Sequence, residues 1–181
     1  MMNQKDGKHA GNKLAVYAGT FDPITLGHLD ILTRASRLFD KVILAVAEDN
    51  YKNTFFDAAE RCQIARQAVA ELKNVEVQSF SGLTVEFCRS VGAVAIIRGL
   101  RALSDFEKEF QIALMNKKVA PEIDSIFLMT APEYQFVSSS IVRNFSQLGY
   151  VPDGIISPCV TEALLRKLGA QKGPNPPEAS Q

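Results

Sequence analysis

The sequence predicts an α/β protein built on a doubly wound, parallel sheet of five strands. Short apolar segments alternate with segments of helical periodicity five times along the chain, which is the pattern of this fold class. Residues 41–47 and 93–97 are almost continuously apolar, as expected for parallel strands covered on both faces. In such folds ligands bind beyond the carboxyl ends of the strands, near the change in strand order.

The strands are predicted from short apolar or alternating segments. Residues 75–80 alternate between apolar and polar side chains, which is the period of a strand with one buried face. The remaining strand candidates are mostly apolar. In chain order, strands are expected at residues 14–18, 41–47, 75–80, 93–97 and 125–129.

The helices between them are predicted from periodicity and capping residues. Apolar residues recur at helical spacing from position 29 to position 39, which indicates the first helix. Asp57 with Glu60, and Ser104 with Glu107, resemble capping boxes that begin helices running to about residues 72 and 119. The remaining helices are expected at residues 85–91, 138–149 and 157–169, the last beginning with a serine and a proline.

The chain has 181 residues, which fits one domain with a sizeable core. We assign that domain to residues 13–169. Residues 1–12 and 170–181 are polar, and the second segment contains three prolines, so both tails are expected to be disordered.

Composition and charge argue against several classes of protein. The formal net charge is zero, whereas non-specific nucleic-acid binders usually carry a basic excess. The sequence has neither the apolar core of a signal peptide nor a stretch long enough to span a membrane. The three cysteines are widely spaced, which argues against a disulfide framework or a zinc site and fits a reducing compartment. We therefore expect a cytoplasmic protein with no nucleic-acid or membrane partner.

The segment after the first predicted strand carries the strongest functional signal. It contains Gly19-Thr-Phe-Asp-Pro, followed by Thr25-x-Gly27-His28 at the start of a helix. Glycine lets backbone N–H groups approach a phosphate closely, and a helix N-terminus favours anions. His28 falls in the first helical turn, where its ring can donate a hydrogen bond to a phosphate oxygen.

Two motifs resemble the signatures of the nucleotidyltransferase superfamily. The segment from Gly19 to His28 is similar to the first signature, and Val137-Ser-Ser-Ser-Ile-Val-Arg143 is similar to the second. Arg98-Gly-Leu-Arg101, followed by Asp-Phe-Glu and Met-Asn, resembles the bacterial phosphopantetheine adenylyltransferases over about residues 13–168. The resemblance implies a Rossmann-like nucleotidyltransferase fold and the transfer of an adenylyl group from ATP to 4′-phosphopantetheine.

The resemblance also implies roles for particular residues. It assigns catalysis to His28, Lys52 and Arg101, with His28 stabilising the pentacovalent phosphorus and the departing pyrophosphate. The implied phosphopantetheine site consists of Thr20, Lys52, Thr84 and Arg98. The residues implied in ATP binding follow the first, fourth and fifth predicted strands and are Thr20, Phe21, His28, Gly99, Leu100, Arg101, Glu109, Tyr134, Gln135, Phe136, Val137, Ser138, Ser139 and Ser140.

The chemistry of these residue types agrees with that assignment. A phosphate nucleophile is already ionised at neutral pH, so the reaction needs no general base. It needs cations and hydrogen-bond donors around an in-line displacement at the α-phosphorus. No dedicated metal cluster is evident, so Mg²⁺ is expected to arrive on the ATP phosphates. The resemblance further predicts a homohexamer.

Three alternatives remain at this stage. Another adenylyl- or cytidylyltransferase of the superfamily, such as one acting on nicotinate mononucleotide, would use a different acceptor. A non-catalytic nucleotide-binding module would be expected to lack His28 or the arginine pair, and both are present. A hydride-transferring enzyme would carry Gly-x-Gly-x-x-Gly after the first strand, and this chain does not.

Overall fold

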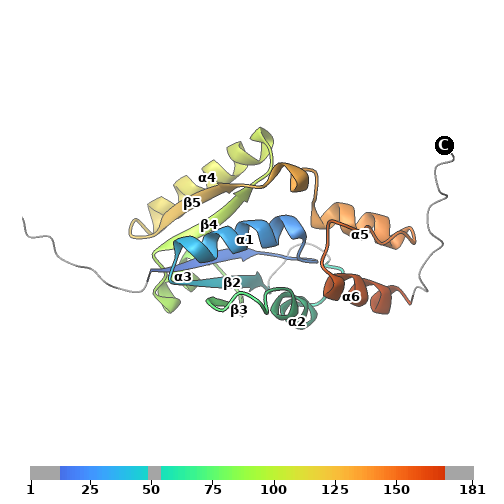
Figure 1. Cartoon of the computed structure of the whole chain (residues 1–181). Coiled ribbons are helices and arrows are strands. Elements are labelled where there is room, and N and C mark those ends of the chain that lie inside the picture. The colour runs from blue at the N-terminus through green and yellow to red at the C-terminus, as the bar shows by residue number, and fades with distance from the viewer. Residues whose placement is uncertain (1–12, 49–53, 170–181) are drawn as a thin grey trace, which may run out of the picture.

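A five-stranded sheet with every neighbouring pair parallel forms the centre of the molecule (Figure 1). The computed structural model describes residues 13–48 and 54–169. The strand order is β3-β2-β1-β4-β5, so the order reverses between β1 and β4. The strands are β1 (Leu14–Gly19), β2 (Lys41–Ala47), β3 (Val75–Phe80), β4 (Ala95–Leu100) and β5 (Asp124–Met129). The predicted doubly wound sheet is confirmed.

Helices connect the strands and close the chain. They are α1 (Leu26–Leu38), α2 (Ala58–Ala68), α3 (Thr84–Val91), α4 (Leu103–Val119), α5 (Ser139–Gln147) and α6 (Pro158–Leu168), with a short 3₁₀ turn η1 (Pro132–Tyr134) before α5. Helices α5 and α6 lie beyond the carboxyl ends of the strands (Figure 1). The predicted capping box of α2 is present, because Asp57 and Glu60 exchange side-chain to backbone hydrogen bonds of 2.8 and 2.9 Å.

Several predicted boundaries are wrong; strand β4, for example, ends at Leu100 and not at residue 97. Three others have a local reason. Helix α4 begins at Leu103 with Ala102 as its N-cap, because the backbone N–H of Asp105 donates to Ala102 and closes the first turn there. Helix α2 ends at Ala68 because Leu72 donates to Val69 in a tight turn. Strand β4 begins two residues later than predicted, since the N–H of residue 93 closes the end of α3 instead. The predicted tails lie outside the described residues.

The sheet has a hydrophobic core on each face. Alternate residues of β1, such as Ala15 and Tyr17, pack with α1, α2 and α6 on one face. Val16 and Ala18 point to the other face and pack with α3 and the segment that follows α4. Parallel strands buried on both faces read as continuous apolar runs, which explains the sequence of β2.

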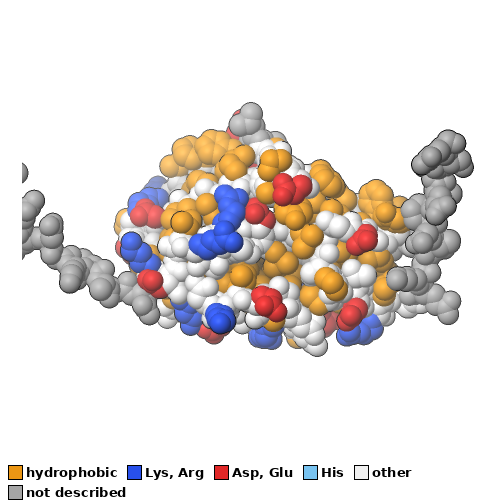
Figure 2. Space-filling model, in the orientation of Figure 1, with side chains coloured by type: hydrophobic (Ala, Val, Ile, Leu, Met, Phe, Trp, Pro, Cys, Tyr) orange, Lys and Arg blue, Asp and Glu red, His pale blue; other side chains and the backbone are white. Residues whose placement is uncertain are grey.

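The edge formed by α4 and β5 is packed less completely. None of the described side chains of α4 is buried, and every residue of the edge strand β5 is at least partly exposed. Large apolar side chains are exposed here, among them Phe110, Leu114 and Met115. Figure 2 shows hydrophobic side chains gathered over this edge, at the upper left of the view.

Two further findings concern the cysteines and the helices. All three cysteines are free; Cys62 and Cys88 are buried and Cys159 is partly exposed. Among the described residues, no helix combines the length and apolar character that a membrane crossing requires.

Candidate active site

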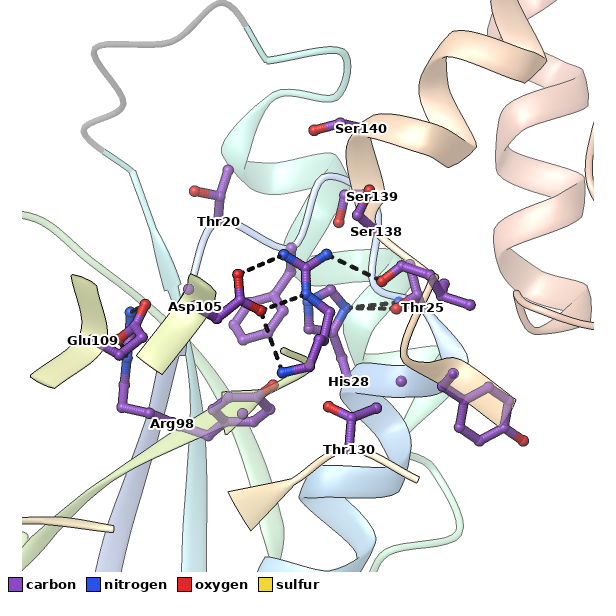
Figure 3. A pocket seen from close by; sticks show the side chains of 18 of the residues that line it. Thr20, Thr25, His28, Arg98, Asp105, Glu109, Thr130, Ser138, Ser139 and Ser140 are labelled. Atoms are coloured by element: carbon purple, nitrogen blue, oxygen red, sulfur yellow. Dashed lines mark hydrogen bonds and ion pairs between the residues drawn. The ribbon is translucent and has the colours of Figure 1, made fainter. Parts of the chain in front are cut away.

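A cleft of about 370 Å³ opens at the carboxyl ends of β1 and β4, where the strand order reverses. Its walls come from the β1–α1 turn, the first turn of α1, the end of β4, α4 and the segment from Thr130 to the start of α5 (Figure 3). Both the position and the volume are typical of small-molecule sites in doubly wound folds.

The β1–α1 turn is held in an uncommon conformation. Phe21 is buried and has a φ of 49°, in the left-handed region that L-residues with large side chains rarely adopt. Its ring packs edge-on against the rings of Tyr17 and His28. A Cβ atom on Gly19 would lie 2.9 Å from the Phe21 ring, so glycine is required at this position to make room for that ring.

The buried side chain of Arg61 holds this turn through hydrogen bonds. It is 2% exposed and its guanidinium donates to the carbonyl oxygens of Thr20, Ala47 and Phe56 at 2.7 to 3.1 Å. Since buried backbone carbonyls need hydrogen-bond donors, one side chain fixes the turn to the end of β2 and to the start of α2.

The tautomer of His28 follows from its hydrogen bonds. The backbone N–H of Thr25 lies 3.0 Å from Nδ1 of His28, and the Thr25 hydroxyl lies 2.9 Å from the same atom. A backbone N–H can only donate, so Nδ1 accepts and the ring proton sits on Nε2. His28 lines the cleft, and its available donor is Nε2–H.

The protonation state of His28 agrees with this geometry. Burial, followed by the positive charge of Arg101, lowers the pKa of His28 to about 4. The ring is therefore neutral near pH 7. A neutral histidine with Nε2–H can donate one directed hydrogen bond to an oxygen of a bound phosphate.

At the end of β4, Arg98 is held by two partners. Its Nε and Nη2 atoms bind the two carboxylate oxygens of Glu109 at 2.5 and 2.7 Å, and Nη1 donates to the carbonyl of Ala18 at 3.0 Å. A guanidinium has five N–H groups, and these contacts to described residues use three of them. Arg98 can therefore offer further donors to an anion.

Arg101 is oriented in a similar way by Asp105. Nε and Nη2 of Arg101 donate to the two carboxylate oxygens of Asp105 at 3.0 and 3.3 Å (Figure 3). Nη1 of Arg101 donates to the carbonyl of Val137 at 3.3 Å. Burial alone would raise the pKa of Asp105, but the hydrogen bonds and charge of Arg101 outweigh that effect and lower it. Asp105 thus stays ionised and holds Arg101 toward the start of α5.

The N-terminus of α5 completes the cleft. Ser138 is its N-cap and accepts a hydrogen bond from Ile141 N–H at 3.2 Å. Ser138, Ser139 and Ser140 all line the cleft (Figure 3). Unpaired N–H groups and the dipole at a helix start favour phosphate oxygens.

The cleft brings together most of the residues that were predicted to bind ATP. It also includes Arg98, which was predicted to bind the acceptor. The lining includes Thr20, Phe21, His28, Gly99, Arg101, Glu109, Tyr134, Val137, Ser138, Ser139 and Ser140. Four predicted residues are not among the described lining residues: Leu100 is buried, Gln135 and Phe136 are exposed, and Thr84 begins α3. Lys52 lies outside the described residues. The individual roles of all these residues stay predictions.

Tyr17, Asp105 and Thr130 also line the cleft, and none of them was assigned a role from the sequence. Tyr17 lies within β1 and resembles any other core residue of an apolar run; burial raises its pKa well above the ordinary value, so its phenol stays protonated. Thr130 directly follows β5, and the rule that ligands bind beyond strand ends could have identified it. Asp105 belongs to a recognised motif, but its pairing with Arg101 can be predicted only when the position of α4 in three dimensions is known.

Comparison with known proteins gives a consistent family. The family model described as cytidylyltransferase-like matches residues 16–145. The chain is 54% identical over 157 residues to the phosphopantetheine adenylyltransferase of Moorella thermoacetica, covering 87% of this chain and 98% of that one. It is 53% identical over 156 residues to the enzyme of the same name from Methylococcus capsulatus, covering 86% and 96%.

Solved structures with low sequence identity share the fold. A structure from Vibrio parahaemolyticus, described as a nicotinate-nucleotide adenylyltransferase, superposes with a TM-score of 0.66 at 20% identity, covering 86% of this chain and 99% of that one. A bifunctional NMN adenylyltransferase/ADP ribose pyrophosphatase from Francisella tularensis gives a TM-score of 0.69 at 16% identity, covering 90% of this chain and 51% of that one. At such identities the likeness establishes the fold alone, here the expected nucleotidyltransferase fold.

Proposed function

This chain belongs to the phosphopantetheine adenylyltransferase family of cytidylyltransferase-like proteins, and from that membership we propose that it transfers the adenylyl group of ATP to 4′-phosphopantetheine. The products are dephospho-coenzyme A and pyrophosphate. The observation that carries the proposal is the convergence of three anion-binding groups on one cleft: Arg98, the Nε2–H of His28 and the N-terminus of α5.

The three groups match the three charged parts of the reaction. An oxygen of the acceptor phosphate, held by Arg98, attacks the α-phosphorus of ATP. The bond between that phosphorus and the oxygen bridging to the β-phosphate breaks, and pyrophosphate leaves toward α5. His28 donates through Nε2 to the phosphoryl group as charge develops, and Arg101 supplies a nearby positive charge. Each well-placed donor contributes on the order of 3 kcal/mol to such a transition state.

Magnesium is proposed to enter as part of the ATP substrate. Among the described residues, no group of three or more His, Cys, Asp or Glu side chains is arranged to hold a metal ion. The two acidic residues of the cleft, Glu109 and Asp105, are paired with Arg98 and Arg101. Phosphate oxygens and water are the ligands that Mg²⁺ prefers in nucleotide sites.

We further propose that the chain assembles into homohexamers, as the family resemblance predicts. The exposed apolar side chains of α4 and β5 support assembly through this edge, because monomers rarely expose such contiguous surfaces. Leu114→Glu on α4 should reduce the assembled mass measured by light scattering. Leu148→Glu, at an exposed apolar position after α5, is the control and should leave the mass unchanged.

The compartment is proposed to be the cytoplasm. The three cysteines of the described chain are free thiols. Free thiols without disulfides are typical of proteins kept in a reducing environment.

A pyrophosphate-release assay with ATP, Mg²⁺ and 4′-phosphopantetheine tests the proposed reaction. The same assay with nicotinate mononucleotide as acceptor, and with CTP in place of ATP, provides the comparison. Release with 4′-phosphopantetheine and ATP alone supports the proposal. Release with nicotinate mononucleotide but not with 4′-phosphopantetheine would contradict it.

A further inference from the structure

Arg143, the last residue of the second signature motif, contacts the β1–α1 turn. It is not among the described residues that line the cleft. Its Nη1 atom donates to the backbone carbonyl of Asp22 and lies 3.3 Å from the Asp22 Oδ2 atom. The side chain of Asp22 is 1% exposed and that of Arg143 is 25% exposed. The two signature motifs, 121 residues apart in the chain, are thus joined by a largely buried ion pair.

Asp22 also anchors a third segment. Its Oδ2 atom accepts a hydrogen bond from Phe55 N–H at 2.8 Å, and its Oδ1 atom accepts one from Phe56 N–H at 2.9 Å. A buried carboxylate is stable when its charge is paired and its oxygens are hydrogen-bonded. One carboxylate therefore links the β1–α1 turn, the segment that leads into α2, and α5.

A second contact fixes the rotation of α5. The Ser139 hydroxyl donates to the carbonyl of Pro23 at 2.8 Å. Residues 139 and 143 are one helical turn apart and lie on the same face of α5. Both hold the β1–α1 turn, at two neighbouring carbonyls, so α5 can neither slide along that turn nor rotate freely. This orientation places its first turn, with Ser138 and Ser140, at the cleft.

We propose that Asp22 and Arg143 are a positioning pair, which sets the distance between the α5 phosphate site and the β1–α1 turn and thereby the affinity for ATP. The inference rests on the proposed function for its kinetic part, but not for the binding of ATP. Arg143 acts through α5 and does not touch the substrate. At the acceptor end of the cleft, Arg98 is held by Glu109 and Ala18. The position of Arg98 is therefore independent of the Asp22–Arg143 pair.

Arg143→Met, Arg143→Lys and Asp22→Asn test the pair, with Ser146→Ala as the matched control. Ser146 is buried on α5, one turn after position 142. Among the described residues, its hydroxyl donates only to the carbonyl of Val142, which belongs to the same helix. ATP affinity is measured by calorimetry without acceptor. The KM values for ATP and 4′-phosphopantetheine come from pyrophosphate release, and thermal unfolding reports the folded fraction of each variant.

Arg143→Met should raise the Kd and the KM for ATP about tenfold, with the KM for 4′-phosphopantetheine within about twofold of wild type, because losing the charge-assisted contact with Asp22 displaces only the α5 end of the cleft. Arg143→Lys keeps the charge and should recover most of the affinity. The double variant with Arg143→Met and Asp22→Asn should raise the Kd for ATP no more than the larger of the two single changes does. Ser146→Ala should bind ATP as wild type does.

Two results would overturn the proposal. If Arg143→Met lowers the unfolding temperature while its folded protein binds ATP with the wild-type Kd, the pair is structural only. If the KM values for ATP and acceptor rise equally, the effect is not confined to α5. Failure of the proposed function is a separate result: wild-type protein would release no pyrophosphate with 4′-phosphopantetheine, while the ATP-binding series would still judge the pair.

Discussion

The two sides of the cleft hold their functional side chains by different means. His28 is fixed by the backbone N–H of Thr25 and by the ring of Phe21, and both of these residues are buried. Arg98 and Arg101 are paired with acidic residues of α4, a helix with no buried side chain among those described. The histidine side is thus set within one chain, whereas the arginine side depends on a helix that the monomer anchors weakly. We infer that assembly over α4 would order the arginine side.

The largest effect is expected from removing the fixed donor. His28→Ala should lower kcat by about 10²- to 10³-fold, because a preorganised donor to developing charge is lost. The Kd for ATP, measured by calorimetry, should change little, since the other phosphate contacts remain. If kcat were unchanged, the α1 side of the cleft would have no part in catalysis.

On the arginine side, a change in binding is expected rather than in turnover. Arg98→Ala should raise the KM for 4′-phosphopantetheine about 10- to 100-fold, through loss of a charge-assisted phosphate contact. Arg98→Lys should lie between the two, because lysine keeps the charge without the planar fork. Steady-state kinetics with each substrate varied in turn measure the effect; a lower kcat at unchanged KM would contradict this division of roles.

A pH titration of stability tests how firmly the histidine side is preformed. The pKa of His28 is about 4 in the folded chain, owing first to burial and then to Arg101, and about 6.5 when unfolded. Between these values the unfolded state binds more protons, so stability should fall as pH falls from 6.5 to 4. The expected loss is about 1 to 2 kcal/mol, less than the full shift implies because the ring is partly exposed.

Urea unfolding of wild type and His28→Gln at several pH values measures this loss. The variant should lack that part of the pH dependence, because glutamine has no titrating group. Equal slopes in the two proteins would show that His28 titrates normally in the folded state.

The smallest effect is expected from the surface pair of the arginine side. Arg101 is 40% exposed in its side chain and Asp105 is 27% exposed, and partly exposed pairs contribute little to stability. Asp105→Asn should lower the free energy of unfolding by less than about 1 kcal/mol. A larger loss in urea unfolding at pH 7 would mean that α4 is anchored through this pair, which would weaken the contrast between the two sides.

Much of the fold could be predicted because its signals are local. Strands β2 and β3 have the predicted bounds, and the Asp57–Glu60 capping box opens α2. The start of α4 was predicted two residues too far along, since Ser104 and Glu107 fit the capping pattern while the backbone closes its first turn on Ala102. Local patterns identify an element better than its first residue.

The site was predictable in its position but not in its internal contacts. Motifs and strand ends indicated where Thr20, His28 and Arg98 would meet. The pairing of Arg143 with Asp22, and of Arg98 with Glu109, depends on helices being placed in three dimensions. The Thr25–His28 hydrogen bond is an exception: it is local, and a threonine three residues before a side chain with an acceptor is the pattern of a capping box.

The burial of Cys62 and Cys88 has a consequence for a substrate that ends in a thiol, as 4′-phosphopantetheine does. Disulfide exchange requires an accessible thiolate. Burial raises the pKa of Cys88 to about 12 and also raises that of Cys62, so neither forms a thiolate readily. Both positions are thereby protected from mixed disulfides with oxidised substrate, and a thiol-alkylating reagent should label the partly exposed Cys159 first.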